Sequence, residues 1–88
     1  MPAGTIYSQQ SGSAQIERGA GELVGILVTS SSSGTLKVWD NPAATGNVIM
    51  DTTDTITAPQ FIACPVNFAA GLYVTAGGTI KYTVVYSR

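Results

Sequence analysis

The sequence predicts an all-β protein, an antiparallel β-sandwich of about seven to eight short strands with a jelly-roll or immunoglobulin-like arrangement. Three observations indicate this fold class. No segment places apolar residues at helical spacing over three turns. Thr, Val, Ile, Tyr, Ser and Gly are abundant, which is typical of strands and turns. Gly and Pro divide the chain at intervals of roughly 8 to 12 residues, as turns divide the strands of a sandwich. At 88 residues, the chain is expected to form a single domain, residues 1–88.

The first half of the chain contains two weak strands followed by two stronger ones. Glu22–Thr29 is apolar on both alternating phases, which predicts a central strand covered on both sides. The Ser-rich stretch Ser30–Gly34 predicts a loop. Asn41 and Pro42 end the strand that follows it. The strands expected in this half are Thr5–Gln9, Ala14–Arg18, Glu22–Thr29 and Thr35–Asp40.

The second half of the chain is expected to contain a further four strands. Thr52–Pro59 is rich in Thr and is interpreted as a loop or a weak edge strand. Pro65 lies inside an apolar run and predicts an edge position or a bulge, because Pro cannot donate to a strand ladder. The strands expected here are Asn47–Asp51, Gln60–Phe68, Leu72–Thr75 and Thr79–Ser87.

The last two expected strands are interpreted as a hairpin. A two-residue loop would put the apolar faces of the two strands out of phase. A three-residue loop at Ala76–Gly78 corrects this and places its last glycine at the left-handed position of a bulge. This register sets Leu72 opposite Tyr82 and, on the outer face, Tyr73 opposite Lys81.

The core predicted from these strands is small, so its apolar burial only slightly exceeds the entropy cost of ordering the chain. A thin core is one reason to expect a homo-oligomer. The predicted inward residues are Leu36, Val38, Val48, Met50, Ile62, Val66, Phe68, Leu72, Val74, Ile80, Tyr82 and Val84.

The low charge of the chain excludes several classes of function. Only 10% of residues are charged and the formal net charge is −1, whereas ordinary domains have about 25% charged residues. Four Lys and Arg residues cannot neutralise many phosphates, so we expect no nucleic-acid partner. The chain has no histidine, which excludes a His-based triad and His-ligated zinc. With few charges to desolvate, the surface favours packing against another protein.

The N-terminus and the single cysteine indicate where the protein is made. Residues 1–4 lack the basic start and apolar stretch of a signal peptide. The longest apolar run, Leu23–Val28, is far shorter than the roughly 20 residues of a membrane span. Cys64 has no cysteine to pair with, and it lies on the core phase as a small hydrophobe. We therefore expect synthesis in the cytoplasm and no membrane partner.

Trp39 is the most informative residue for function. By alternation it points away from Leu36 and Val38 and shares the outward phase with Lys37. An outward Trp would anchor an interface or form a platform for sugar stacking. If the faces are reversed, Trp39 would belong to the core, as the Trp of immunoglobulin-like domains does. Tyr73 raises the same alternatives. The candidate interface residues are Lys37, Trp39, Tyr73 and Lys81.

Neither a metal site nor catalysis is expected. The oxygen-bearing side chains of Asp40, Asn41, Asp51 and Asp54 are of the type that calcium prefers, but their spacing is not that of a calcium-binding loop. We therefore expect no metal and no cofactor. A domain this small has little room for a cleft in which two carboxylates could converge. Cys64 has no histidine to activate it, so we expect no enzymatic activity. The carboxylates considered are Glu17, Glu22, Asp40, Asp51 and Asp54.

A pattern of strands and turns over about residues 22–86 is similar to a known group of proteins. The segments that carry the likeness are Ser33–Asp40, Gly46–Ile49, Pro65–Phe68, Gly71–Thr75, Gly78–Thr79 and Thr83–Tyr86. The chain resembles the small β-sandwich structural proteins of tailed-bacteriophage virions, found among head and neck components. The resemblance implies a structural role and transfers no catalytic motif. Residues 1–20 lie outside it and are interpreted as an N-terminal arm that docks on a neighbour.

The resemblance implies a non-enzymatic virion protein that decorates or cements a capsid, or joins head and tail parts. Its expected partners are the major capsid protein or other virion proteins. We also expect copies of the chain itself to associate, with a trimer favoured because capsid decorations often lie on local three-fold axes. The expected location is the virion. The alternative function is a small glycan- or receptor-binding β-sandwich module that uses Trp39 and Tyr73 as platforms.

Overall fold

The computed structural model describes residues 5–51 and 55–87 of the chain. This part is all-β, as predicted, and its six antiparallel strands belong to one open sheet. Within it, two long strands replace four of the short strands expected, which lowers the strand count to six. The strands are β1 (Thr5–Gln10), β2 (Ala14–Glu17), β3 (Gly21–Asp40), β4 (Asn47–Asp51), β5 (Gln60–Phe68) and β6 (Leu72–Ser87).

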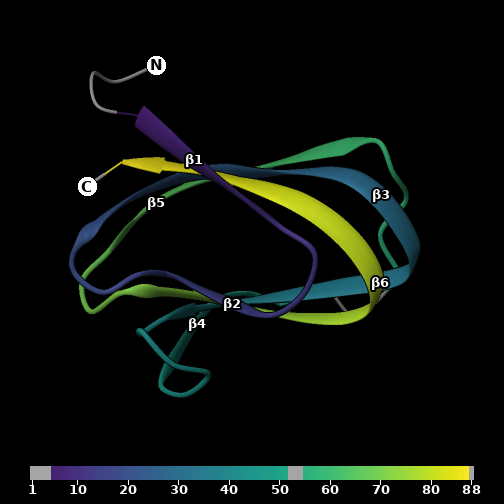
Figure 1. Cartoon of the computed structure of the whole chain (residues 1–88). Helices are drawn as coiled ribbons and strands as arrows, with labels where there is room; N and C mark the ends of the chain where they lie inside the picture. The colour runs from purple at the N-terminus through teal and green to yellow at the C-terminus, as the bar shows by residue number, and fades with distance from the viewer. Residues whose placement is uncertain (1–4, 52–54, 88) are drawn as a thin grey trace.

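The two long strands, β3 and β6, run side by side and both bend in the middle (Figure 1). The bend folds the sheet over, so that an upper half and a lower half face each other (Figure 1). In the upper half, β1 pairs with the second part of β6 and β5 pairs with the first part of β3. In the lower half, β2 pairs with the first part of β6 and β4 pairs with the last part of β3. Both long strands therefore belong to both halves.

The bend forms where the sequence predicted a loop, at 30–34, and a hairpin turn, at 76–78. Ser33 and Gly78 have left-handed backbone conformations, with φ of 58° and 69°. The pairing of β3 with β6 shifts register between Ser32 and Thr35, as at a bulge. The predicted loop at 30–34 and the predicted hairpin at 76–78 are therefore both wrong. Glycine supplies the positive φ of a bulged corner as readily as that of a turn, and at Ser33 the chain adopts a positive φ without a glycine.

Without the hairpin, the residues expected opposite each other lie far apart. Tyr73 pairs with Trp39 in the lower half, whereas Lys81 pairs with Ser30 in the upper half. Leu72 pairs with Glu17 of β2, so the predicted contact with Tyr82 across a hairpin does not form. Leu72 and Tyr82 nevertheless face the core and Tyr73 and Lys81 face outward, as predicted, because alternation within each of these strand segments is local.

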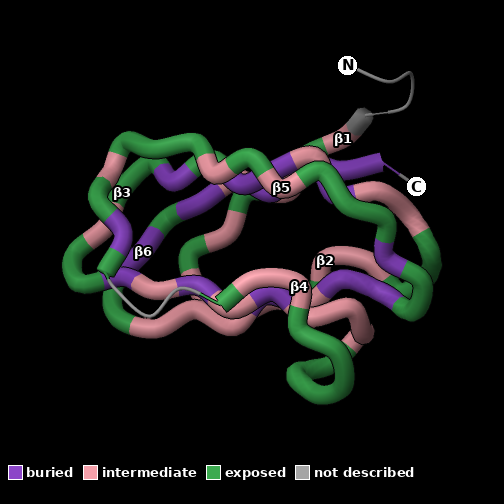
Figure 2. Tube along the Cα trace, turned by 180° about the vertical axis from the view of Figure 1, so that it is seen from behind, coloured by how far each residue is buried: buried purple, intermediate pink, exposed green. Residues whose placement is uncertain are grey.

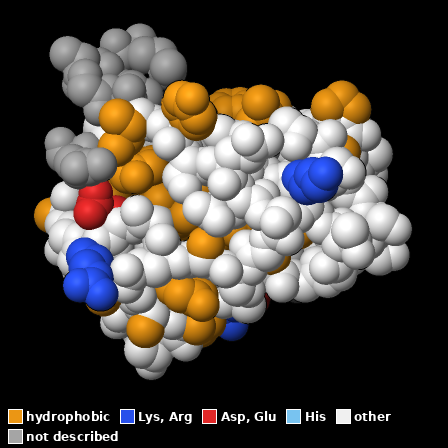
Figure 3. Space-filling model, in the orientation of Figure 1, with side chains coloured by type: hydrophobic (Ala, Val, Ile, Leu, Met, Phe, Trp, Pro, Cys, Tyr) orange, Lys and Arg blue, Asp and Glu red, His pale blue; other side chains and the backbone are white. Residues whose placement is uncertain are grey.

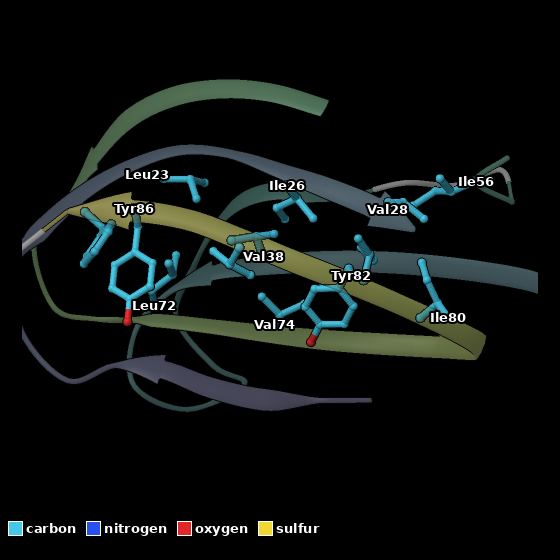
Figure 4. Close-up of a cluster of buried hydrophobic side chains, with 13 residues drawn as sticks. Leu23, Ile26, Val28, Val38, Ile56, Leu72, Val74, Ile80, Tyr82 and Tyr86 are labelled. Atoms are coloured by element: carbon cyan, nitrogen blue, oxygen red, sulfur yellow. The ribbon is translucent and has the colours of Figure 1, made fainter. Parts of the chain in front are cut away.

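The hydrophobic core lies between the two halves (Figures 2 and 4). Val48 and Val66 were expected in it but are 44% and 36% exposed. A register shift in the pairing of β3 with β4 turns Val48 outward, and Val66 lies on the edge strand β5. Met50 and Ile62 are only partly buried against the core. The buried core residues are Leu23, Ile26, Val28, Leu36, Val38, Ile56, Phe68, Leu72, Val74, Ile80, Tyr82, Val84 and Tyr86.

Three further predictions concern Pro65, Cys64 and the Thr-rich segment Thr52–Pro59. Pro65 lies at a register shift in β5, which among the described strands pairs with β3 alone, so both of its predicted contexts are present. Cys64 is partly buried against the core. Ile56 in the Thr-rich segment is buried, and its N–H donates to the Gly34 carbonyl at 2.8 Å. Residues 52–54 of that segment lie outside the described residues.

The N-terminal strands β1 and β2, which were expected to form an arm, both pair with β6 of the same chain. In residues 5–51 and 55–87 there is no helix of the length and hydropathy that crossing a membrane requires.

Candidate functional site

Trp39 lies on the outer face of the lower half of the sheet. Its neighbours Leu36 and Val38 point into the core, and Trp39 itself is only partly buried, which excludes it from the core cluster. The indole Nε1 donates a hydrogen bond to the Thr75 hydroxyl at 3.0 Å. Tyr73 pairs with Trp39 from the adjacent strand, so the two aromatic residues are neighbours on this face. The outward residues here, which we call the Trp39 face, are Gln15, Lys37, Trp39, Val48, Asp51, Tyr73 and Thr75.

Lys37 covers part of Trp39 and balances a nearby carboxylate. Its Nζ lies 4.5 Å from the centroid of the indole ring, a cation–π contact. The same Nζ lies 3.9 Å from Oδ2 of Asp51 on β4, in a partly exposed ion pair. Such a pair contributes little to stability. It nevertheless leaves the Trp39 face without net charge near the ring.

The oxygen ligands considered for calcium are used elsewhere in the fold. Oδ1 of Asp40 accepts hydrogen bonds from the backbone N–H groups of Ala69 and Ala70, at 3.0 and 2.9 Å. Oδ1 of Asn41 accepts from the N–H of the residue two positions on, as in an ordinary Asx turn. Asp51 pairs with Lys37.

Asp54 lies outside the described residues. Among the residues that are described, no three His, Cys, Asp or Glu side chains gather into a set that could hold a metal. Of the carboxylates considered for catalysis, Asp40 and Asp51 thus have structural partners of their own.

Lys81, the fourth predicted interface residue, is separate from the other three. It is exposed on the upper half, where it lines an open hollow of about 260 Å³ with Gln9, Gln10 and Ser11. The lining is polar and shallow, and no aromatic side chain takes part in it. The structure therefore brings Lys37, Trp39 and Tyr73 together and leaves Lys81 out.

The outer face of the upper half is a second surface, and it is more apolar than the first. Tyr7 is 75% exposed, Phe61 51% and Leu27 39%. A side chain at Gly25 would meet the Phe61 ring at 2.5 Å, so this ring lies directly over the glycine. Hydrophobic side chains gather along the margin of the upper half in the space-filling view (Figure 3). The outward apolar residues here, which we call the Phe61 face, are Tyr7, Gly25, Leu27, Phe61, Ala63 and Val85.

The Phe61 face was missed as a site, although the sequence contained its signal. Glu22–Thr29 is apolar on both phases and was expected to be covered on both sides. The core covers the inward side, but the outward side holds Leu27, which remains more than one-third exposed. The strand therefore has two apolar phases, of which the fold of the single chain covers one.

Two buried tyrosines of β6 connect the core to the backbone of residues 12–16 by hydrogen bonds. The ring of Tyr82 is fully buried, and its hydroxyl donates to the Gly12 carbonyl at 2.5 Å. The Tyr86 hydroxyl donates to the Ile16 carbonyl at 3.4 Å. Both side chains extend from β6 toward the lower half (Figure 4). Burial, and to a smaller extent the nearby Tyr73 phenol, raise the pKa of Tyr82 to about 12. Neither phenol faces a pocket, so both tyrosines serve the fold.

Comparison of the chain with protein-family models, with curated proteins and with solved structures found no match. The likeness to virion proteins therefore remains an expectation from the sequence, and the two outer faces are the features from which a function can be inferred.

Proposed function

We propose that the chain is a non-enzymatic structural protein of a bacteriophage virion that decorates or cements the capsid, or joins head and tail parts. The observation that carries the proposal is that both outer faces of the folded-over sheet present large apolar or aromatic side chains with little net charge. Proteins that act by packing against other proteins have such surfaces, since few charges lose their water on binding. We further propose that the two halves correspond to the layers of a β-sandwich, of the jelly-roll or immunoglobulin-like kind.

The Trp39 face is the surface we assign to a virion partner such as the major capsid protein. A partly buried Trp next to a Tyr is the type of anchor that contributes most to protein interfaces. Thr75 fixes the indole through its hydrogen bond, so binding would order few additional side-chain torsions. Val48, turned outward by the bulge in β4, adds apolar surface beside the ring. Self-association on the particle, as the trimer that the resemblance leads us to expect on local three-fold axes, is part of the same proposal.

The second candidate is a glycan-binding module. The adjacent rings of Trp39 and Tyr73 favour it, because sugars stack on aromatic faces. Lys37 weighs against it, since its Nζ lies over the Trp39 ring where a sugar would stack. The hollow on the upper half lies away from both rings. We therefore rank glycan binding below protein binding.

Trp39→Ala tests the proposal with two measurements. The first is binding to purified particles of the bacteriophage that encodes the chain, and the second is thermal unfolding of the isolated protein. We expect binding to weaken by about 30-fold or more, since an anchor contributes about 2 kcal/mol or more. The loss of stability should stay well below the roughly 3–5 kcal/mol of a truncated core aromatic. The control is Thr57→Ala, an exposed residue outside both faces, which should change neither quantity.

Three results would count against the virion contact. A Trp39→Ala protein that still binds particles fully would remove this face from the interface. A protein that loses binding only because it unfolds would make Trp39 a residue of the fold. Quenching of Trp39 fluorescence by simple sugars at millimolar concentration, without particle binding, would favour the glycan-binding alternative.

A further inference from the structure

We infer that the Phe61 face binds the Phe61 face of a second copy of this chain, related by a two-fold axis that lies in the plane of the face and perpendicular to the strands. The inference names the partner of one face of the proposed structural protein and to that extent rests on the proposed function. Its basis is the set of charges and side-chain sizes that the register of the upper half places on its outer face.

The first observation is the position of the charges. Among the described outward residues of the upper half, only Glu22 and Lys81 are charged, and the surface between them is apolar or uncharged. Glu22 pairs with Ser87, whereas Lys81 pairs with Ser30. The acid and the base therefore lie at opposite ends of this part of β6, roughly 20 Å apart at about 3.3 Å per residue.

This separation makes the face complementary to itself in one orientation. The proposed axis turns the second copy end for end, so that Glu22 of each copy meets the Lys81 end of the other. An axis parallel to the strands would instead place Glu22 over Glu22 and Lys81 over Lys81. Like charges facing each other disfavour that arrangement, so the charges select the end-for-end dimer.

Side-chain size agrees with the same orientation. Phe61 and Ala63 are successive outward residues of β5, paired with Leu27 and Gly25 of β3. The end-for-end axis exchanges these two rows, so Phe61 of each copy lies over Ala63 of the other. A large side chain then meets a small one, as close packing of two sheets requires.

The inference also explains why β3 is apolar on both phases. Leu27 is 39% exposed in the single chain, although it lies on a strand with neighbours on both sides. A second copy would cover it together with Phe61 and Tyr7. The face spans only short parts of four strands, β1, β6, β3 and β5, which places the contact at the small end of specific interfaces. We therefore expect a dissociation constant on the order of 10 μM.

The first test measures the mass of the purified chain by sedimentation equilibrium between about 1 and 200 μM. We expect a monomer–dimer equilibrium. Phe61→Lys should raise the dissociation constant at least tenfold, because it places a cation in the apolar centre of the contact. The matched control, Val48→Lys, puts the same charge at a similarly exposed apolar residue of the Trp39 face, and it should change the constant less than threefold.

The second test is a charge exchange, and it does not depend on how well Phe61→Lys folds. Glu22→Lys alone and Lys81→Glu alone should each weaken the dimer about tenfold, because each creates like-charge contacts across the axis. The double variant, Glu22→Lys with Lys81→Glu, should return the constant to within threefold of the original. Salt at about 0.5 M should reduce these differences.

A monomer at all concentrations would overturn the inference. So would a dimer or trimer that Phe61→Lys leaves intact, or a double variant that dimerises no better than the single ones. These measurements use the chain alone, whereas the proposed function is read from particle binding. A monomer that still binds particles through Trp39 would thus overturn only the inferred dimer. A dimer that does not bind particles would overturn only the proposed virion function.

Discussion

Tyr82 serves both the core and the connection between β1 and β2. Its ring is fully buried between the halves of the sheet, and its hydroxyl holds the turn at Gly12 by a hydrogen bond. Only the neutral phenol can donate this bond. Burial and the Tyr73 phenol raise the pKa of Tyr82 to about 12, so the folded chain keeps the proton at pH values where an unfolded chain loses it.

The raised pKa of Tyr82 predicts that stability falls as pH rises from about 10 to about 12. In that window the unfolded chain binds fewer protons than the folded chain, so raising the pH favours unfolding by up to about 1.4 kcal/mol per pH unit. Below about pH 10 the contribution is complete. Tyr82→Phe should cost about 1 kcal/mol near pH 8, through the lost hydrogen bond. Urea unfolding of both proteins at about pH 8, 10 and 11.5 should show this deficit shrinking, and a constant deficit would contradict the prediction.

For single residues, alternation along a strand predicts which face a side chain occupies, except where a bulge interrupts the strand. Alternation along Thr35–Asp40 predicted that Lys37 and Trp39 face outward, and they do, because the pleat depends only on neighbours in the chain. The same rule failed for Val48, because a bulge in β4 moves one residue out of phase. A bulge depends on the partner strand, which the local sequence does not identify.

At the scale of elements, the corner between the two halves decides the fold. Ser33 of β3 and Gly78 of β6 lie against each other there, so close that an added Cβ at Gly78 would stand 2.1 Å from the Ser33 carbonyl oxygen. Both have positive φ. Each long strand therefore turns its corner against the other, and a substitution in one corner must disturb both strands.

Gly78→Ala should lower the free energy of unfolding by roughly 2–4 kcal/mol. The left-handed conformation disfavours a side chain, and the contact with backbone atoms of Ser33 leaves no flexible group to move aside. Gly19→Ala is the matched control, because a Cβ there meets nothing within 4 Å. It should change stability by less than about 1 kcal/mol. Urea unfolding measures both, and equal small effects would show that the corner tolerates a side chain.

Most strand positions could be predicted from the sequence, but the connections between them could not. The limits of β4 and β5 match the expected ranges, because Gly46 precedes β4, Pro59 precedes β5 and Gly71 closely follows β5. Ser30–Gly34 was interpreted as a loop and Ala76–Gly78 as a hairpin turn, although a strand continues through each of them. The residues that make a tight turn also make a bulged corner, and only the pairing of one corner with the other distinguishes the two.

At the scale of the whole molecule, β3 and β6 make the two halves of the sheet inseparable. Each long strand contributes core residues to both halves: β3 places Val28 in the upper and Val38 in the lower half. Likewise, β6 places Val84 in the upper and Val74 in the lower half. The upper half cannot unfold without releasing strands on which the lower half depends. The fold class followed from composition and periodicity, whereas this shared architecture depends on pairs such as Thr5 with Ser87, which are 82 positions apart in the sequence.

The shared strands predict that the molecule unfolds as one cooperative unit, and the single tryptophan allows a direct check. Trp39 fluorescence reports on the lower half, while far-ultraviolet circular dichroism reports on the whole sheet. Val84→Ala removes buried surface in the upper half and should cost roughly 2 kcal/mol. Because the halves share β3 and β6, both probes should show the same loss and coincident transitions. Val48→Ala, at a residue 44% exposed, is the matched control and should cost well under half as much. A fluorescence transition that stays at its original urea concentration while the circular dichroism transition moves would show that the two halves unfold separately.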